Sequence, residues 1–268
     1  MSKKLVHLYI VTGATGGLGE ALVQALARHA ADQNEERHMV LVGRNQQKLE
    51  SISIQAANAH LYCVPGLDLK QPPDHTTSQI MAKFRSVSDA VSPTYITLIH
   101  CAGSIGDLSK TVGQYTADEI VQYTTVNFTS YCTLTSQFLN FTTASTAQRI
   151  SIVNISSLLA VCAFANWGLY ASIKAARDQL LKVVAKENTD GRVKTLSYSP
   201  GPLDNSMQQA VRETIGDKEQ QDTYAQLHRE NKLVAVDTTA NLLCTLLDKW
   251  EFESGAHIDI FDLVPPPA

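Results

Sequence analysis

The stretch Thr12-Gly13-Ala14-Thr15-Gly16-Gly17-Leu18-Gly19 decides the fold, because it joins an apolar run to a segment with helical spacing. The run before it, near 5–11, is typical of a buried strand, and the apolar residues of 17–32 recur as on a helix. Glycine permits a sharp turn and close approach of backbone to ligand, and a helix N-terminus stabilises negative charge. A dinucleotide pyrophosphate site is therefore predicted, bound by Gly13, Thr15, Gly16, Gly17, Leu18 and Gly19.

Outward from this loop, strand-like runs alternate with amphipathic stretches along the chain. Strands are expected near 5–11, 38–43, 60–67, 95–100, 149–155, 193–198 and 256–261, and helices near 17–32, 45–57, 74–91, 116–144, 168–188 and 237–250. Such alternation predicts parallel strands joined by helical crossovers. The expected fold is α/β, a doubly wound, seven-stranded parallel sheet with helices on both faces, of Rossmann type. Nothing in the composition divides 1–268, so one domain is expected.

Residues 199–232 depart from the alternation, because they are polar and helix-prone after Pro200-Gly201-Pro202. In an α/β sheet, extra chain after a late strand lies above the carboxyl ends of the strands, where ligands bind. We therefore expect 199–232 to form a lid over the substrate.

Composition limits the class of partner. The chain has 268 residues, 44% of them hydrophobic and 18% charged, with a net charge of −4 and no basic run, so no nucleic-acid partner is expected. The longest apolar run, 158–165, is far shorter than the roughly 20 residues of a membrane helix. The five cysteines form no C-x-x-C pair, and the eight histidines show no metal-ligand spacing, so neither disulfides nor a metal are expected. A small-molecule partner and a cytoplasmic location are predicted.

The end of the second strand bears on the choice of dinucleotide. An acidic residue there would bond the ribose 2′-hydroxyl of NAD, but the strand ends Val42-Gly43-Arg44. Arg44 can pair with the 2′-phosphate of NADP, which favours NADP(H), although it can also simply cap the next helix. Asp68, followed by Leu69, can accept a hydrogen bond from the adenine amino group or cap a turn.

Ser157, Tyr170 and Lys174 form a second group. Tyr170 and Lys174 are four residues apart, so they share one face of the predicted helix. A phenol with its usual pKa near 10 is a weak acid, and a nearby cation such as Lys174 lowers that pKa. The expected reaction is hydride transfer to a carbonyl carbon, with Tyr170 donating a proton to the oxygen and Ser157 hydrogen-bonding it.

Together these motifs resemble the short-chain dehydrogenase/reductase family over essentially the whole chain. The resemblance rests on the glycine loop, Ala102-Gly103, Asn127, Ser157, Tyr170-x-x-x-Lys174 and Pro200-Gly201. It implies an NADP(H)-dependent oxidoreductase in which Ala102, Gly103, Tyr170 and Lys174 contact the cofactor. It also implies that Asn127 holds a water in the proton relay.

Residues 103–110, 200–204, 207–209 and 254–259 narrow the resemblance to reductases of pterin side-chain ketones. This implies a homodimer active in tetrahydrobiopterin synthesis, with its contact through the helices near 116–144 and 168–188. Asp259 would accept hydrogen bonds from the pterin ring, although a strand-end aspartate without a ligand is the alternative. The resemblance places Ser157, Leu158, Tyr170 and Gly201 at the substrate, and Leu203, Asn205 and Met207 at the cofactor.

The chain departs from the family pattern at three places, one of them Asn205-Ser206, where Thr-Asp is usual. His100-Cys101 stands where Asn-Asn is usual, and Thr15-Gly16 where NADPH-dependent members often carry a basic residue. Two alternatives therefore stay open: a general carbonyl reductase of diketones, quinones or sugars, and a non-catalytic NADP-sensing module. The intact trio of Ser157, Tyr170 and Lys174 speaks against the second.

Overall fold

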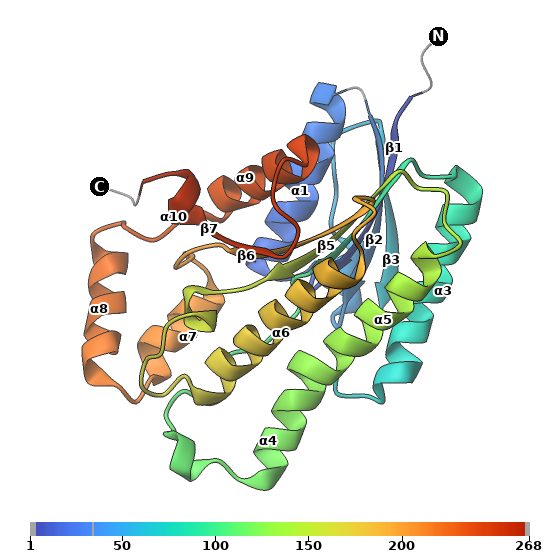
Figure 1. Cartoon of the computed structure of the whole chain (residues 1–268). Coiled ribbons are helices and arrows are strands. Elements are labelled where there is room, and N and C mark those ends of the chain that lie inside the picture. The colour runs from blue at the N-terminus through green and yellow to red at the C-terminus, as the bar shows by residue number, and fades with distance from the viewer. Residues whose placement is uncertain (1–3, 34, 266–268) are drawn as a thin grey trace.

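The computed structural model describes residues 4–33 and 35–265, which form a parallel sheet between two layers of helices (Figure 1). The strands are β1 (Val6–Thr12), β2 (Glu36–Gly43), β3 (Ala59–Pro65), β4 (Tyr95–His100), β5 (Arg149–Ile155), β6 (Val193–Ser199) and β7 (Ala256–Asp259). They lie in the order β3-β2-β1-β4-β5-β6-β7, and every neighbouring pair is parallel. The predicted doubly wound, seven-stranded fold is confirmed.

Helices cover both faces of the sheet. The longer ones are α1 (Gly17–Gln33), α3 (Pro73–Val91), α4 (Ala117–Thr124), α5 (Ser130–Thr142), α6 (Gly168–Glu187), α7 (Ser206–Thr214), α8 (Lys218–Arg229) and α9 (Val236–Lys249); α2 (Gln46–Glu50) and α10 (Ile260–Leu263) are short. Single 3-10 turns are η1 (Val112–Gln114) and η3 (Leu158–Ala160). Along β2, Met39 and Leu41 pack toward α1 and α9, whereas Val40 and Val42 pack toward α3 and α5. Burial on both faces explains why the strands are almost continuously apolar.

The strand order reverses at β1, which pairs with β2 on one side and β4 on the other. Its last residue, Thr12, is in register with Val42 of β2 and His100 of β4. In doubly wound sheets such a reversal opens a crevice at the carboxyl ends of the strands. The glycine loop begins at this crevice.

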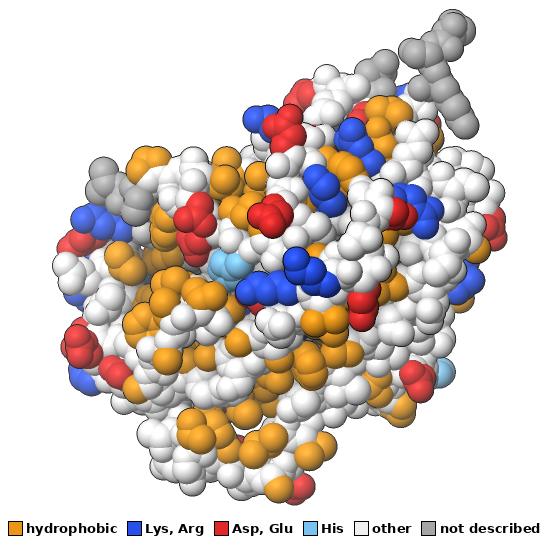
Figure 2. Space-filling view, viewed as in Figure 1, with side chains coloured by type: hydrophobic (Ala, Val, Ile, Leu, Met, Phe, Trp, Pro, Cys, Tyr) orange, Lys and Arg blue, Asp and Glu red, His pale blue; other side chains and the backbone are white. Residues whose placement is uncertain are grey.

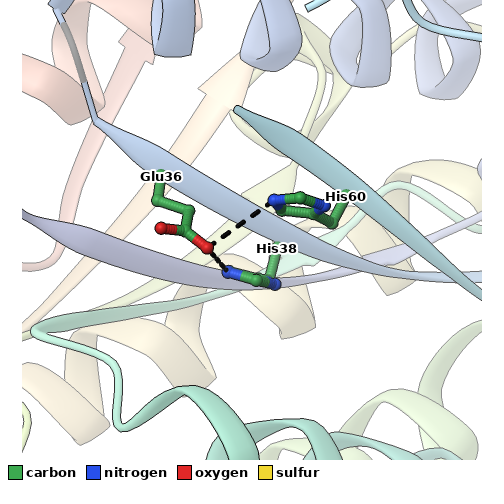
Figure 3. Close-up of side chains that lie close together, drawn as sticks. All are labelled: Glu36, His38 and His60. Carbon is green, nitrogen blue, oxygen red and sulfur yellow. Dashed lines mark hydrogen bonds and ion pairs between the residues drawn. The ribbon is translucent and has the colours of Figure 1, made fainter. Parts of the chain in front are cut away.

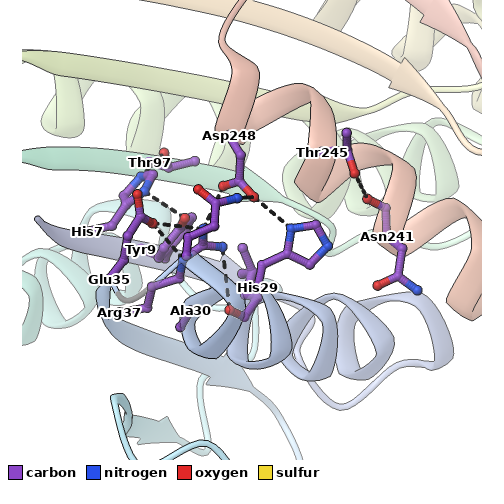
Figure 4. A network of polar contacts seen from close by, with 12 residues as sticks. His7, Tyr9, His29, Ala30, Glu35, Arg37, Thr97, Asn241, Thr245 and Asp248 are labelled. Carbon is purple, nitrogen blue, oxygen red and sulfur yellow. Dashed lines mark hydrogen bonds and ion pairs between the residues drawn. The ribbon is translucent and has the colours of Figure 1, made fainter.

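A buried ion-pair network fastens the α1 and α9 layer to the amino ends of the strands (Figure 4). Arg37 of β2 is fully buried and donates to Glu35 Oε2 at 2.9 Å and to Asp248 Oδ1 at 2.6 Å. His29 Nδ1 lies 2.7 Å from the other oxygen of Asp248. Burial opposes the charge, but Tyr9, Asp248 and Glu35 raise the pKa of Arg37 above its usual value. Removing one carboxylate would leave a buried cation uncompensated, which costs about 3–5 kcal/mol.

Several predicted boundaries were wrong. The helix expected at 45–57 is only α2, because Ser51 caps it and the β-branched Ile52 turns into the core. The strand expected at 60–67 ends at Pro65, after which Gly66 turns with φ +73°. The strand expected at 256–261 ends at Asp259, whose side chain caps α10.

The helix expected at 116–144 is divided into α4 and α5 by a π-helical turn, η2 (Thr125–Thr129). Such turns shift the backbone hydrogen bonding by one residue and occur often at functional sites. Here the turn contains Asn127.

Residues 199–232 contain α7 and α8, which stand as a pair beside the start of α6 (Figure 1). A hydrogen bond from Trp167 Nε1 to Gln220 Oε1, 2.7 Å long, joins α8 to the start of α6. Among the described residues, no helix is both long and apolar enough to cross a bilayer.

Candidate active site

A cavity of about 1140 Å³ opens where the carboxyl ends of the strands meet. Apart from Gly19, every residue assigned above to cofactor, substrate or catalysis lines this cavity. Gly19 is buried behind the loop, where a Cβ would lie 2.1 Å from the carbonyl oxygen of Gly13. The motifs therefore meet in one space, although they are scattered along the chain.

The glycine loop has no room for a side chain at Gly13, where the chain leaves β1. Gly13 has φ +71°, and a Cβ there would lie 2.9 Å from the backbone of Ala102 on the neighbouring loop. Thr12 Oγ1 accepts hydrogen bonds from the N–H groups of Cys101 and Ala102, at 3.2 and 3.1 Å, which holds the two loops together. This cradle at the start of α1 fits a dinucleotide pyrophosphate.

Two cations flank the far end of the cradle. Arg44 at the end of β2 is exposed, and Lys48 of α2 also lines the cavity. The side chain of Asn45, rather than Arg44, caps α2 by accepting from Lys48 N at 2.9 Å. Asp68 lines the cavity and also accepts from Lys70 N at 3.0 Å, so its turn-capping role is real. The sequence pattern had pointed to Arg44 but not to Lys48.

The departure at His100-Cys101 places a neutral imidazole behind the cavity wall. His100 Nε2 lies 3.0 Å from Thr135 Oγ1, and its ring lies 4.2 Å from that of Tyr131 between centroids. Burial, together with Arg177, lowers the pKa of His100 well below its usual value. His100 therefore anchors β4 to α5, and Cys101 is the member of the pair that lines the cavity.

Ser157, Tyr170 and Lys174 converge at the centre of the cavity. Ser157 follows β5, and its Oγ accepts from Leu159 N at 3.2 Å. Tyr170 and Lys174 lie on one face of α6, with Lys174 Nζ 5.4 Å from the centroid of the phenol ring. Lys174 Nζ donates to the carbonyl oxygen of Ile155 at 2.5 Å.

Burial has the largest effect on the pKa values of Tyr170 and Lys174. It raises the pKa of Tyr170 to about 12, against the hydrogen bond of Ser157 and the charge of Arg177, which both lower it. Burial and, second, the charge of Arg177 together lower the pKa of Lys174 to about 7. The expected lowering of the Tyr170 pKa by Lys174 is thus not what the structure shows, since the cation that acts on the phenol is Arg177. At neutral pH the phenol keeps its proton.

Arg177, one helical turn after Lys174, is the most important side chain that the sequence pattern did not reveal. It is buried, its Nε donates to the carbonyl oxygen of Asn127 at 2.5 Å, and it lies 4.6 Å from the ring centroid of Tyr131. The Asn127 side chain is held as well, since Oδ1 accepts from Ser104 N at 2.9 Å and Nδ2 donates to Tyr123 O at 3.0 Å. The π-helical turn and Arg177 together fix Asn127 in the cavity wall.

The carboxylate of Asp259 also lines the cavity. Its Oδ2 accepts from Ser199 Oγ at 2.5 Å and its Oδ1 accepts from Phe261 N at 3.0 Å. Each carboxylate oxygen can accept a further hydrogen bond, so capping α10 does not exhaust the group. The cavity wall also carries the aromatic side chains of Phe164, Trp167, Tyr224 and Phe261.

Behind the cavity, Asp178 connects three elements that carry site residues. This buried carboxylate of α6 accepts from Asn154 Nδ2 and Ser156 Oγ of the β5 region, both at 2.9 Å, and lies 2.6 Å from His257 Nδ1 of β7. Burial opposes its charge, but the hydrogen bonds of His257 and Ser156 lower the pKa of Asp178. The network sets β5, β7 and α6 relative to one another, and with them Ser157, Tyr170 and Asp259.

This fold and site define an oxidoreductase that interconverts alcohols and carbonyls. The family model described as short chain dehydrogenase matches residues 7–216, and the chain belongs to that family, whose members use nicotinamide cofactors. Sepiapterin reductase of Bos taurus is 35% identical over 261 residues, which cover 95% of this chain and 94% of that protein. The benzil reductase ((S)-benzoin forming) of Bacillus subtilis (strain 168) is 28% identical over 258 residues, covering 95% and 98%. The crystal structure of the KRED1-Pglu enzyme has a TM-score of 0.78 at 23% identity and covers 94% of this chain and 100% of that chain.

Proposed function

We propose that this chain is an NADPH-dependent carbonyl reductase that reduces the side-chain ketone of a pterin. The observation that carries the proposal is the Asp259 carboxylate in the wall of the same cavity as Ser157 and Tyr170. A pterin ring offers an amino group beside a ring N–H, and two carboxylate oxygens can accept from both. The similarity to sepiapterin reductases, 31–37% identical across the vertebrate proteins compared, supports this substrate class.

The proposed cofactor follows from the cradle and its flanking charges. Arg44 and Lys48 line the cavity and are the proposed partners of the 2′-phosphate of NADP(H), and Asp68 is the proposed partner of the adenine amino group. Ala102, Gly103, Leu203, Asn205 and Met207 complete the proposed contacts. Asn205 lies against the glycine loop, since a Cβ built on Gly17 would lie 3.4 Å from the Cβ of Asn205. When bound, NADPH supplies the hydride.

The chain's own residues manage the proton. Tyr170, with its pKa raised to about 12, holds a proton at neutral pH and donates it to the carbonyl oxygen. Ser157 donates its hydroxyl proton in a hydrogen bond to the same oxygen, which stabilises the charge that develops there. Lys174, when protonated, adds positive charge beside the phenol. These roles, and the water-holding role of Asn127, are proposals for this chain.

The decisive assay compares NADPH oxidation with sepiapterin and with benzil, using the wild type and Asp259→Asn. Asparagine caps helices as well as aspartate does, so this variant keeps α10 while removing the charge. We expect pterin turnover to fall about 10–100-fold, the value of one or two hydrogen bonds to a charged group. Benzil turnover should stay within a few-fold. Unchanged pterin turnover in Asp259→Asn would defeat the substrate assignment.

A general diketone reductase is the second candidate. The aromatic wall formed by Phe164, Trp167 and Tyr224 suits a flat, apolar ketone, and the Bacillus relative is named for benzil. A higher kcat/KM for benzil than for sepiapterin favours this candidate. Tight NADPH binding with no turnover of either ketone favours the non-catalytic sensing module instead.

We also propose a cytoplasmic homodimer with a lid over its cavity. Figure 2 shows hydrophobic side chains gathered over α4 and α6, where Ile120, Val121 and Val183 are exposed. These helices form the proposed contact, and a monomer in sedimentation at micromolar concentration would contradict it.

Residues 199–232 form the proposed lid, and added NADPH should protect α7 and α8 from limited proteolysis.

A further inference from the structure

A separate group of metal-ligating side chains lies at the amino ends of β2 and β3, and none of its members lines the active-site cavity. Glu36 and His38 are two residues apart on β2, so their side chains point to the same face of the sheet. His60 of β3 is the register partner of His38. Figure 3 shows ring nitrogens of both histidines directed at one oxygen of Glu36. The spacing of these residues along the chain does not reveal the group, because the register of β2 with β3 brings it together.

The separations of the ligand atoms suit a tetrahedral metal ion. Glu36 Oε1 lies 3.0 Å from His38 Nε2 and 3.6 Å from His60 Nε2, and all ligand atoms lie within 4.8 Å of one another. In a tetrahedral zinc site with metal–ligand distances of about 2.1 Å, two ligand atoms lie about 3.4 Å apart. Small side-chain rotations would therefore seat an ion without moving either strand.

We propose that Glu36, His38 and His60 bind a divalent transition-metal ion of the zinc class, with water as the fourth ligand. Imidazole with one carboxylate is a donor set typical of zinc, whereas calcium and magnesium prefer oxygen atoms alone. The side chains of Glu36 and His60 are 34% and 43% exposed, so an ion can enter from solvent. The buried His38, 5% exposed, forms the inner wall.

The neighbours of His38 prepare it as a ligand. Its Nδ1 lies 2.9 Å from the hydroxyl oxygen of Tyr62. That oxygen can accept a hydrogen bond from Nδ1–H, which leaves the lone pair of Nε2 available for the ion. The ring stacks on that of His60 with 4.6 Å between centroids and 21° between planes, which limits rotation of both rings.

The bound ion would act on stability and not on catalysis. β3 is the edge strand of the sheet, and the site joins it to β2 by bonds that the unfolded chain cannot form. An ion that binds only the folded chain stabilises it in proportion to the logarithm of its concentration. We therefore expect zinc to raise the unfolding temperature and to leave kcat unchanged.

The test uses the full chain, stripped with a chelator and carrying Cys162→Ser to remove an exposed thiol that would also bind zinc. Co²⁺ is titrated while the visible bands of a tetrahedral ion are recorded, and Zn²⁺ is titrated by calorimetry. We expect one equivalent of each to bind. His60→Gln should weaken binding about 100-fold or more, and Tyr62→Phe about 10-fold, in line with the loss of a ligand and of its orienting partner. His228→Gln, on exposed α8, is the control and should change nothing.

Circular dichroism of His60→Gln should match that of the parent, since the side chain is half exposed and packs outside the core. No saturable binding by the parent, or binding of equal strength in His60→Gln and the parent, overturns the proposal.

Discussion

Gly19→Ala is the substitution whose effect can be worked most directly from the structure. The added Cβ would lie 2.1 Å from the carbonyl oxygen of Gly13 and 3.1 Å from Cα of Ala14. Carbon and oxygen atoms in close non-bonded contact lie about 3.3 Å apart, so the backbone must yield by about 1.2 Å. Both obstructing atoms belong to the main chain, and no flexible side chain can move aside. Extra atoms in a packed site usually cost about 1–3 kcal/mol, and this site belongs at the upper end, near 3 kcal/mol.

The displaced atoms belong to the proposed pyrophosphate cradle, so stability and cofactor affinity should fall together. A loss of about 3 kcal/mol lowers the melting temperature of a chain of this size by roughly 6–12 °C. The NADPH dissociation constant should rise by about tenfold or more, measured by fluorescence titration at a temperature where the variant is folded. Gly113→Ala is the matched control, because a Cβ at that exposed position meets nothing within 4 Å. If the two variants melt together and bind NADPH equally well, the steric reasoning is refuted.

Four further outcomes are expected. Tyr170→Phe should reduce ketone turnover by about 10²–10⁴-fold while leaving the NADPH dissociation constant unchanged in a fluorescence titration; retained turnover would refute the acid role. Arg44→Asp should raise KM for NADPH about tenfold with little change for NADH, and an unchanged ratio would place the phosphate elsewhere. Asp178→Asn should cost about 3 kcal/mol in urea unfolding at pH 7. Because the folded-state pKa of Asp178 is lowered, that difference should shrink as the pH falls through it. Arg177→Met removes a charge that lowers the pKa of Lys174, so the limb of the kcat/KM profile that belongs to Lys174 should move to higher pH.

The architecture could be predicted because its determinants are local. The central strands β1, β2, β4 and β5 are buried on both faces and carry mostly apolar residues, and most crossovers carry their own helical period. The failures have a different origin. The segment after α2 leaves the helix because Ile52 is drawn into the core, and the shift of hydrogen bonding at η2 leaves no mark on a hydrophobic period. Tertiary packing decides both features.

The candidate site shows the same division. Residues in compact motifs, such as the glycine loop and the pair Tyr170 and Lys174, line one cavity, and their spacing in the sequence is enough to single them out. Gly19 belongs to the motif but serves packing, which spacing does not distinguish from contact with a ligand. Arg177 and Lys48 were missed because their burial and direction depend on elements far away in the chain. An arginine three residues after Lys174, on the same face of the helix, is the available signal.

The charges around Tyr170 bear on how readily it gives up its proton. A phenol whose pKa is raised to about 12 is protonated at neutral pH but is a weaker acid than a free phenol, so transfer of its proton to a ketone oxygen is helped by positive charge nearby. Lys174, with its pKa lowered to about 7, is only partly charged beside it, because burial and then the charge of Arg177 disfavour its protonated form. Negative charge brought into the cavity would raise the pKa of Lys174 and restore that charge. An anionic ligand in the cavity would therefore favour a protonated Lys174 beside the phenol.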